Sequence, residues 1–96
     1  MIENKDGNLS SETPLLIENI TLPDGVTPDE RVQYKIGREV FKLIGAGLGC
    51  PFFVFYDENR GWRTNPVSSI EEDEEKIVLK DNLSVYTFKK ISTLTD

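Results

Sequence analysis

The sequence predicts an α+β fold in which one amphipathic helix packs on a mostly antiparallel sheet of four to five strands, in the chain order β-α-β-β-β-β. Three observations lead to this class. Short apolar runs bounded by turn residues recur along the chain, as expected of strands. A capping motif at residues 27–30 precedes a segment with helical periodicity. The length of 96 residues suits a single domain with one modest core.

The first strand is expected at residues 15–22, after a polar segment without periodicity. Residues 1–14 contain Gly7 and Pro14 and are interpreted as a disordered tail. The folded domain is therefore expected to span residues 15–91, followed by a short C-terminal tail at 92–96. A turn at Pro23-Asp24-Gly25 ends the first strand, because proline presets φ and glycine tolerates positive φ.

The helix prediction rests on a capping box and on charge segregation. Thr27 and Glu30 form the box, and Pro28 occupies the first helical position, where its missing N–H is no loss. Placed at 100° per residue, the following segment gathers its cations on one side and its apolar side chains on the rest of the surface. The cationic helix stripe consists of Arg31, Lys35, Arg38 and Lys42.

A rival interpretation makes the same segment extended. Val32, Tyr34 and Ile36 alternate with polar residues, and Gly37-Arg38 has the composition of a type II′ hairpin turn. The domain would then be a small all-β barrel.

The glycine-rich stretch at residues 45–49 lacks the pattern of a phosphate cradle. Such cradles lead into a helix N-terminus, whose positive dipole end attracts the phosphate. This stretch instead follows the predicted helix and lies at its C-terminus, the negative end of the helix dipole. We interpret the glycines as a helix C-cap, with Pro51 preventing continuation. Cys50 is then expected to be buried and unreactive, since the helix dipole opposes thiolate formation there.

The remaining chain reads as strands joined by tight turns. Residues 52–56 are apolar on both faces and predict a central strand, which returns through a turn at 57–61 to a strand at 62–64. The acidic run at 71–75 is expected in an exposed loop or short helical turn at 69–75. The last two strands are predicted at 76–80 and 83–91.

Composition excludes several chemistries. The chain has no histidine and a single cysteine, so Ser-His-Asp and Cys-His mechanisms and a structural zinc site are excluded. The segment 57–61 resembles the start of a calcium loop but lacks the ligand and glycine that such a loop requires at its fifth and sixth positions. We therefore expect no enzyme activity, no metal and no cofactor.

The net charge of −6 conceals a cationic middle third, because residues 31–66 hold six bases and three acids. No apolar run approaches the length of a membrane span, and the first residues have no apolar leader segment. With one unpaired cysteine, these features predict a cytoplasmic protein that does not contact membrane. The acidic total disfavours a single-stranded nucleic acid as partner.

These observations predict a small non-catalytic binding or regulatory module that contacts an acidic protein surface. The helix stripe and an Arg-Gly-Trp-Arg hairpin are the candidate surface, since arginine and tryptophan are enriched at binding hot spots. The candidate partner-binding residues are Arg31, Lys35, Arg38, Lys42, Arg60, Trp62 and Arg63. The alternative is an acidic inhibitor or immunity-like protein, whose acidic tail and Glu71–Glu75 mimic a polyanion and block a basic, nucleic-acid-handling target.

Overall fold

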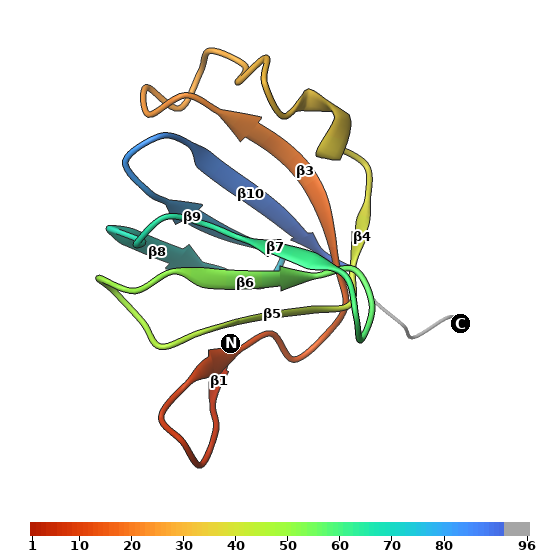
Figure 1. Cartoon of the computed structure of the whole chain (residues 1–96), viewed down its shortest axis with the longest axis vertical. Coiled ribbons are helices and arrows are strands. Elements are labelled where there is room, and N and C mark those ends of the chain that lie inside the picture. Colours follow the sequence, from red (N-terminus) through yellow and green to blue (C-terminus); the bar gives the residue numbers. More distant parts are fainter. Residues whose placement is uncertain (92–96) are drawn as a thin grey trace.

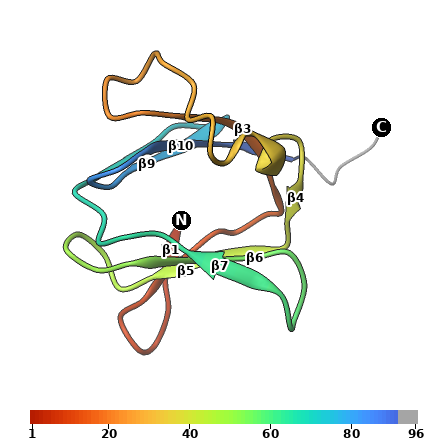
Figure 2. The same cartoon turned by 45° about the horizontal axis from the view of Figure 1, so that its top comes forward.

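Two antiparallel five-stranded sheets face each other in the computed structural model, which describes residues 1–91 (Figure 1 and Figure 2). The first sheet has the order β1 (Ile2–Glu3), β2 (Leu9–Ser10), β5 (Lys42–Gly45), β6 (Phe52–Phe55) and β7 (Gly61–Arg63). The second has the order β4 (Glu39–Val40), β3 (Leu15–Thr21), β10 (Val85–Lys90), β9 (Lys76–Lys80) and β8 (Ser69–Glu72). One 3₁₀ turn, η1 (Gln33–Lys35), is the helical element of this part of the chain.

The predicted α+β class is wrong, and the alternative of a small all-β fold fits. Residues 31–44, expected to form the amphipathic helix, instead contain η1, β4 and most of β5. The hairpin of the rival interpretation, with its turn at Gly37-Arg38, does not form either, because Gly37 and Arg38 exchange backbone hydrogen bonds with Ile17 of β3. Pairing with strands distant in sequence therefore overrides the local helical pattern.

The capping motif serves a different purpose from the one predicted. Thr27 donates through both its backbone N–H and its hydroxyl to the Asp24 carboxylate, which stabilises a turn. The N–H of Asp29 then donates to the Ile20 carbonyl at 3.1 Å, so this segment runs beside the end of β3. Gly37, at φ +90°, ends the 3₁₀ turn in a conformation that favours glycine.

Within residues 1–91 the chain passes between the sheets three times, from β2 to β3, from β4 to β5 and from β7 to β8. The last two passages are corners, and they give the pair of sheets the form of an open, flattened barrel. At the first corner Val40 pairs with β3, whereas Lys42, two residues later, pairs with β6. At the second corner the Val67 N–H donates to the Cys50 carbonyl, and the next N–H, of Ser68, donates to Lys80. Strands that switch sheets in this way are the usual means of making corners in packed sheets.

The core lies between the two sheets and draws on both. In β5, β6, β9 and β10 alternate side chains point inward, as the two-residue period of a pleated strand requires. The buried apolar side chains are Leu15, Ile17, Ile20, Val40, Leu43, Phe52, Val54, Val67, Ile77, Leu79, Tyr86 and Phe88.

The N-terminal segment and the glycine-rich stretch also differ from expectation. Residues 1–14, predicted to be a disordered tail, contain β1 and β2, and β2 extends the first sheet by pairing with β5. The glycine stretch is no helix cap: Gly45 belongs to β5, and Gly47 and Gly49 adopt positive φ in the β5–β6 loop. The predicted C-terminal tail at 92–96 lies outside the described residues.

Replacement of Gly45 tests the packing between β5 and β6. Gly45 is paired with Phe52, and an added Cβ would lie 2.5 Å from that ring. We expect Gly45→Ala to lower the free energy of unfolding by about 1–3 kcal/mol in urea titrations, because the buried ring has to move. The exposed neighbour provides the control, since Ala46→Ser should change stability by less than about 0.5 kcal/mol. An unchanged midpoint for Gly45→Ala would contradict this packing.

Candidate functional site

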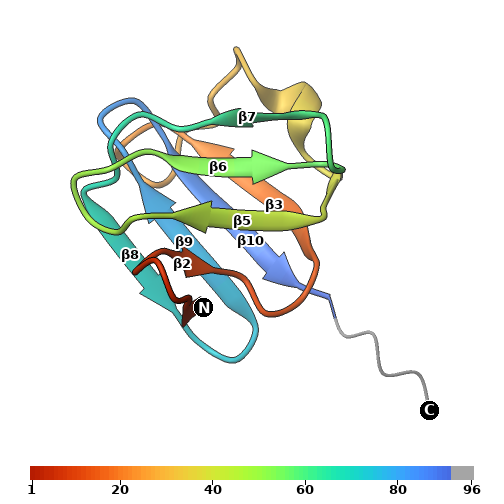
Figure 3. The same cartoon turned by 60° about the horizontal axis from the view of Figure 1, so that its bottom comes forward.

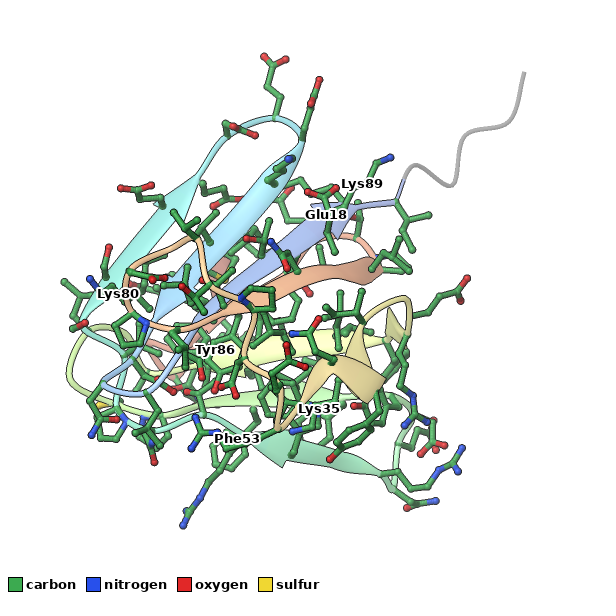
Figure 4. All side chains as sticks on the ribbon, turned by 90° about the horizontal axis from the view of Figure 1, so that it is seen from above. Glu18, Lys35, Phe53, Lys80, Tyr86 and Lys89 are labelled. Atoms are coloured by element: carbon green, nitrogen blue, oxygen red, sulfur yellow. The ribbon has the colours of Figure 1, made fainter. Side chains whose placement is uncertain are left out.

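The outer face of the first sheet exposes aromatic side chains. Phe53 and Phe55 of β6 point away from the core, with their ring centroids 6.2 Å apart and their planes 16° apart. Phe53 is 42% exposed although it lies on an interior strand of the sheet. Figure 4 shows Phe53 on the side of the first sheet, Glu18 and Lys89 on the opposite side, and Tyr86 between the layers.

Cations flank these rings on both neighbouring strands. Lys42 of β5 is paired with Phe55, and Arg63 of β7 is paired with Phe53, so all four side chains share one face. Lys42 and Arg63 are exposed, and neither forms an ion pair within residues 1–91. We call the surface made by Lys42, Phe53, Phe55 and Arg63 the aromatic–cationic face.

A second group of predicted residues lies at the side of the barrel, between η1 and β7. The Lys35 ammonium nitrogen is 3.9 Å from the centroid of the Trp62 ring, and the Arg38 guanidinium carbon is 4.1 Å from that of Tyr56. Trp62 donates its indole N–H to the Tyr56 hydroxyl at 2.7 Å. Partial burial lowers the pKa of Lys35. We call these four residues the side cluster. In its two cation–π contacts the aromatic ring face attracts the cation electrostatically.

Arg31 belongs to neither group, because it pairs with a buried carboxylate. Asp29 is only 2% exposed, and both of its oxygens accept from the Arg31 guanidinium at 2.9 Å. The Ser84 hydroxyl also donates to Asp29, at 2.7 Å. The hydrogen bonds from Arg31 and Ser84 hold the pKa of Asp29 well below its usual range.

A second buried carboxylate, Asp81, continues this polar network. It accepts from the backbone N–H groups of Leu83, Ser84 and Asn65, and from the Tyr86 hydroxyl at 3.2 Å. Burial, reinforced by Asp81, raises the pKa of Tyr86 to about 12. Within residues 1–91 no buried side-chain nitrogen or oxygen lacks a hydrogen-bond partner. The network thus anchors segment 22–38 to the barrel.

Two acidic side chains, Asp57 and Glu58, line the same hollow as Lys42 and Phe55 of the aromatic–cationic face. Arg60 pairs with Asp57 at 2.9 Å in the β6–β7 turn, and this turn also contains the exposed Glu58. Hydrogen bonds from the Asn59 backbone and the Arg60 side chain lower the pKa of Asp57. Arg60 is therefore exposed but already paired, in contrast to Arg63.

The acidic run lies on the far strand of the second sheet rather than in a loop alone. Its first members belong to β8, and the turn to β9 carries the others. The Glu72 carboxylate is bound by the Lys90 ammonium at 2.8 Å and by the Met1 amino group. Asp73 accepts from two backbone N–H groups and shapes the turn. Two of the five carboxylates are thus engaged within the chain.

The predicted site residues therefore divide into separate groups instead of forming one stripe. Lys42 and Arg63 share the aromatic–cationic face, Lys35, Arg38 and Trp62 share the side cluster, and Arg31 and Arg60 are paired. Sequence reasoning missed Phe53 and Phe55. The sequence did contain a signal for them, because residues 52–56 are apolar on both faces of the strand. In a domain with a single core only one of these faces can be buried, so the other must carry apolar side chains toward the outside.

No protein-family model, curated protein or solved structure matches the chain. Within residues 1–91 no group of three or more potential metal ligands comes together, Cys50 is a free, half-buried thiol, and no helix is long and apolar enough to cross a membrane.

The buried Asp29 makes stability depend on pH in a defined direction. Because its folded-state pKa lies below the ordinary value of 3.8, its contribution is complete above that value and is lost as pH falls through the folded pKa. We expect Asp29→Asn to lower the free energy of unfolding at pH 7 by about 2 kcal/mol, since a buried charged acceptor is lost. The variant should also lose less stability than the parent between pH 5 and about pH 2 in urea titrations.

The exposed neighbour Glu30 provides the matched control for this substitution. Glu30→Gln should leave the unfolding midpoint at pH 7 unchanged within error, since its side chain is in solvent. Parallel pH profiles for Asp29→Asn and the parent would contradict the assignment of this acid sensitivity to Asp29.

Proposed function

We propose that the protein is a small non-catalytic binding or regulatory module whose aromatic–cationic face contacts an acidic segment of a protein partner. The observation that supports the proposal is the stacked pair of Phe53, which is exposed, and Phe55, which is half-buried. This pair lies beside two cations that have no ion-pair partner within residues 1–91. Exposed apolar patches with a polar rim are typical of interaction sites. Aromatic residues and arginine are also enriched in protein interfaces.

The charge of the surface supports an acidic protein partner. An acidic side chain placed beside Arg63 or Lys42 would find a free cation, whereas the core-facing residues of the same strands are already packed. A polynucleotide has a higher charge density, and a chain of net charge −6 would repel it over longer distances. We also propose a cytoplasmic location, because the single cysteine, Cys50, is free.

The alternative function, an acidic inhibitor that mimics a polyanion, depends on the opposite edge of the molecule. It is supported by the exposed carboxylates Glu71, Glu74 and Glu75 at β8 and its turn. Two other acids of the run are engaged within the chain, which reduces the charge free to meet a basic target. The two functions therefore predict different sensitive residues.

An acidic peptide provides a direct test of the proposed function. The probe is acetyl-Asp-Phe-Asp-Asp-Phe-Asp-Asp-amide, titrated into ¹⁵N-labelled protein while amide shifts are recorded. We expect the shifts to concentrate on β5, β6 and β7. The paired substitution Lys42→Glu and Arg63→Glu should weaken binding at least about 30-fold, because two attractive contacts of roughly 1 kcal/mol become repulsive.

Lysines of the opposite sheet provide the matched control. The paired substitution Lys80→Glu and Lys89→Glu makes the same charge change on the outer face of the second sheet and should leave peptide affinity within about threefold. No binding at millimolar peptide, or equal loss in both double variants, would contradict the proposed face. Preferential binding of an oligothymidylate would instead assign the face to nucleic acid.

A further inference from the structure

The edge of the first sheet beside the aromatic–cationic face is open. Figure 3 shows β7 as the outermost strand of its sheet, and within residues 1–91 no strand pairs with its second edge. The Tyr56 N–H donates to the Arg60 carbonyl, and the Thr64 N–H donates to Phe52. Antiparallel ladders alternate, so residues 61 and 63 turn their backbone N–H and C=O groups away from β6. These groups are available to another strand.

Charge makes this edge selective. Short strands and charged side chains are the devices by which proteins prevent unwanted pairing at an edge. β7 has three residues, and Arg63 at its end is exposed and forms no ion pair within residues 1–91. A neutral or basic strand would have to leave this cation unpaired or repelled. An acidic strand would pair with it.

A hollow at Gly61 offers room for one apolar side chain. Gly61 is paired with Phe55, and the hollow beside it is lined by Phe53, Phe55, Asn59, Gly61, Trp62 and Arg63. This chain cannot fill the hollow from position 61 itself, because a Cβ there would lie 2.3 Å from the Val54 carbonyl oxygen. A side chain from an adjacent strand can cover the half-buried Phe55 ring, as aromatic residues do beside glycine in sheets.

The opposite face of β7 adds a third requirement. Trp62, a member of the side cluster, is paired with the buried Val54 and therefore lies on the inner face of the sheet. Lys35 lies over its ring and forms no ion pair within residues 1–91. Side chains of an added strand alternate between the two faces. A residue opposite Trp62 would therefore point toward Lys35, whereas its two neighbours would point toward the Gly61 hollow and toward Arg63.

We propose that the partner binds as an added strand on the free edge of β7, with an apolar side chain in the Gly61 hollow, an acid toward Lys35 and a second acid beside Arg63. The recognised segment is extended and contains one apolar residue followed by two acids, or the reverse order if it runs in the opposite direction. This inference rests on the proposed function and specifies how the acidic segment is held. Main-chain hydrogen bonds supply affinity, and alternate side chains supply specificity.

Backbone methylation of the peptide probe tests the added strand. Two versions of the acidic heptapeptide carry N-methyl groups at the odd or the even positions, so that one of them removes the N–H groups that would face β7. We expect that version to bind at least ~10-fold more weakly than the unmodified peptide, because it loses one or more main-chain hydrogen bonds to β7. The other version should lose less affinity. In the unmodified complex the Gly61 and Arg63 amides should become protected from hydrogen exchange.

Two variants of Arg63 separate the contribution of its side chain to peptide binding from that of its backbone N–H. Arg63→Ala retains the outward N–H, whereas Arg63→Pro removes it from an edge position where proline is tolerated. Arg63→Pro should bind the unmodified peptide ~10-fold more weakly than Arg63→Ala. The thermal midpoint of each variant verifies that it is folded. If Arg63→Pro does not fold, the methylated peptides still decide the question.

The outcomes distinguish this inference from the proposed function. If the unmodified peptide binds and depends on Lys42 and Arg63, but both methylated versions bind equally well, then strand addition is wrong and the proposed face survives. If the unmodified peptide does not bind, both are contradicted. A selective loss with one methylated version, together with protection of Gly61 and Arg63, supports strand addition.

Discussion

Four apolar residues in succession cannot all be buried in a molecule with one core. On β6 the two-residue period of a strand sends Phe52 and Val54 into the core, so that Phe53 and Phe55 must face the other way. No layer of residues 1–91 covers that other face, because the two sheets enclose a single space between them. The outward-facing aromatic pair is therefore a direct consequence of the register of β6, and the proposed function depends on it.

The buried carboxylates determine where the cations lie. Asp29 joins Ser84, in the turn between β9 and β10, to Arg31, and this anchor holds a long connection that would otherwise have little regular structure. The connection then brings Lys35 and Arg38 against Trp62 and Tyr56 beside β7. Burying an acid is costly unless it is paired and hydrogen-bonded, and Asp29 meets both conditions. The side cluster thus depends on a polar network that lies beneath it.

The extended segments could be predicted from the sequence, and the pairing between them could not. The strands at β3, β6, β7, β9 and β10 follow from apolar runs between turn residues, and the structure places strands there. The helix prediction was wrong because it relied on Thr27 and Glu30, which satisfy only a local rule. Residues 38–45 instead pair with β3 and β6, which come from elsewhere in the chain. For the same reason the cations at 31–42 were expected together and were found in separate groups. That Lys42 and Arg63 share a face depends on the register of β6 with both neighbours, which no local pattern contains.

The most direct test compares two adjacent phenylalanines by the free energy of unfolding of single variants. Phe52 is fully buried and Phe53 projects into solvent. If Phe53 serves binding and not folding, Phe52→Ser should cost at least about 3 kcal/mol, whereas Phe53→Ser should cost less than about 1 kcal/mol and leave the folded structure intact. Equal costs for the two variants would mean that Phe53 is retained for stability. The aromatic–cationic face would then be part of the structure of the domain and not a surface kept for a partner.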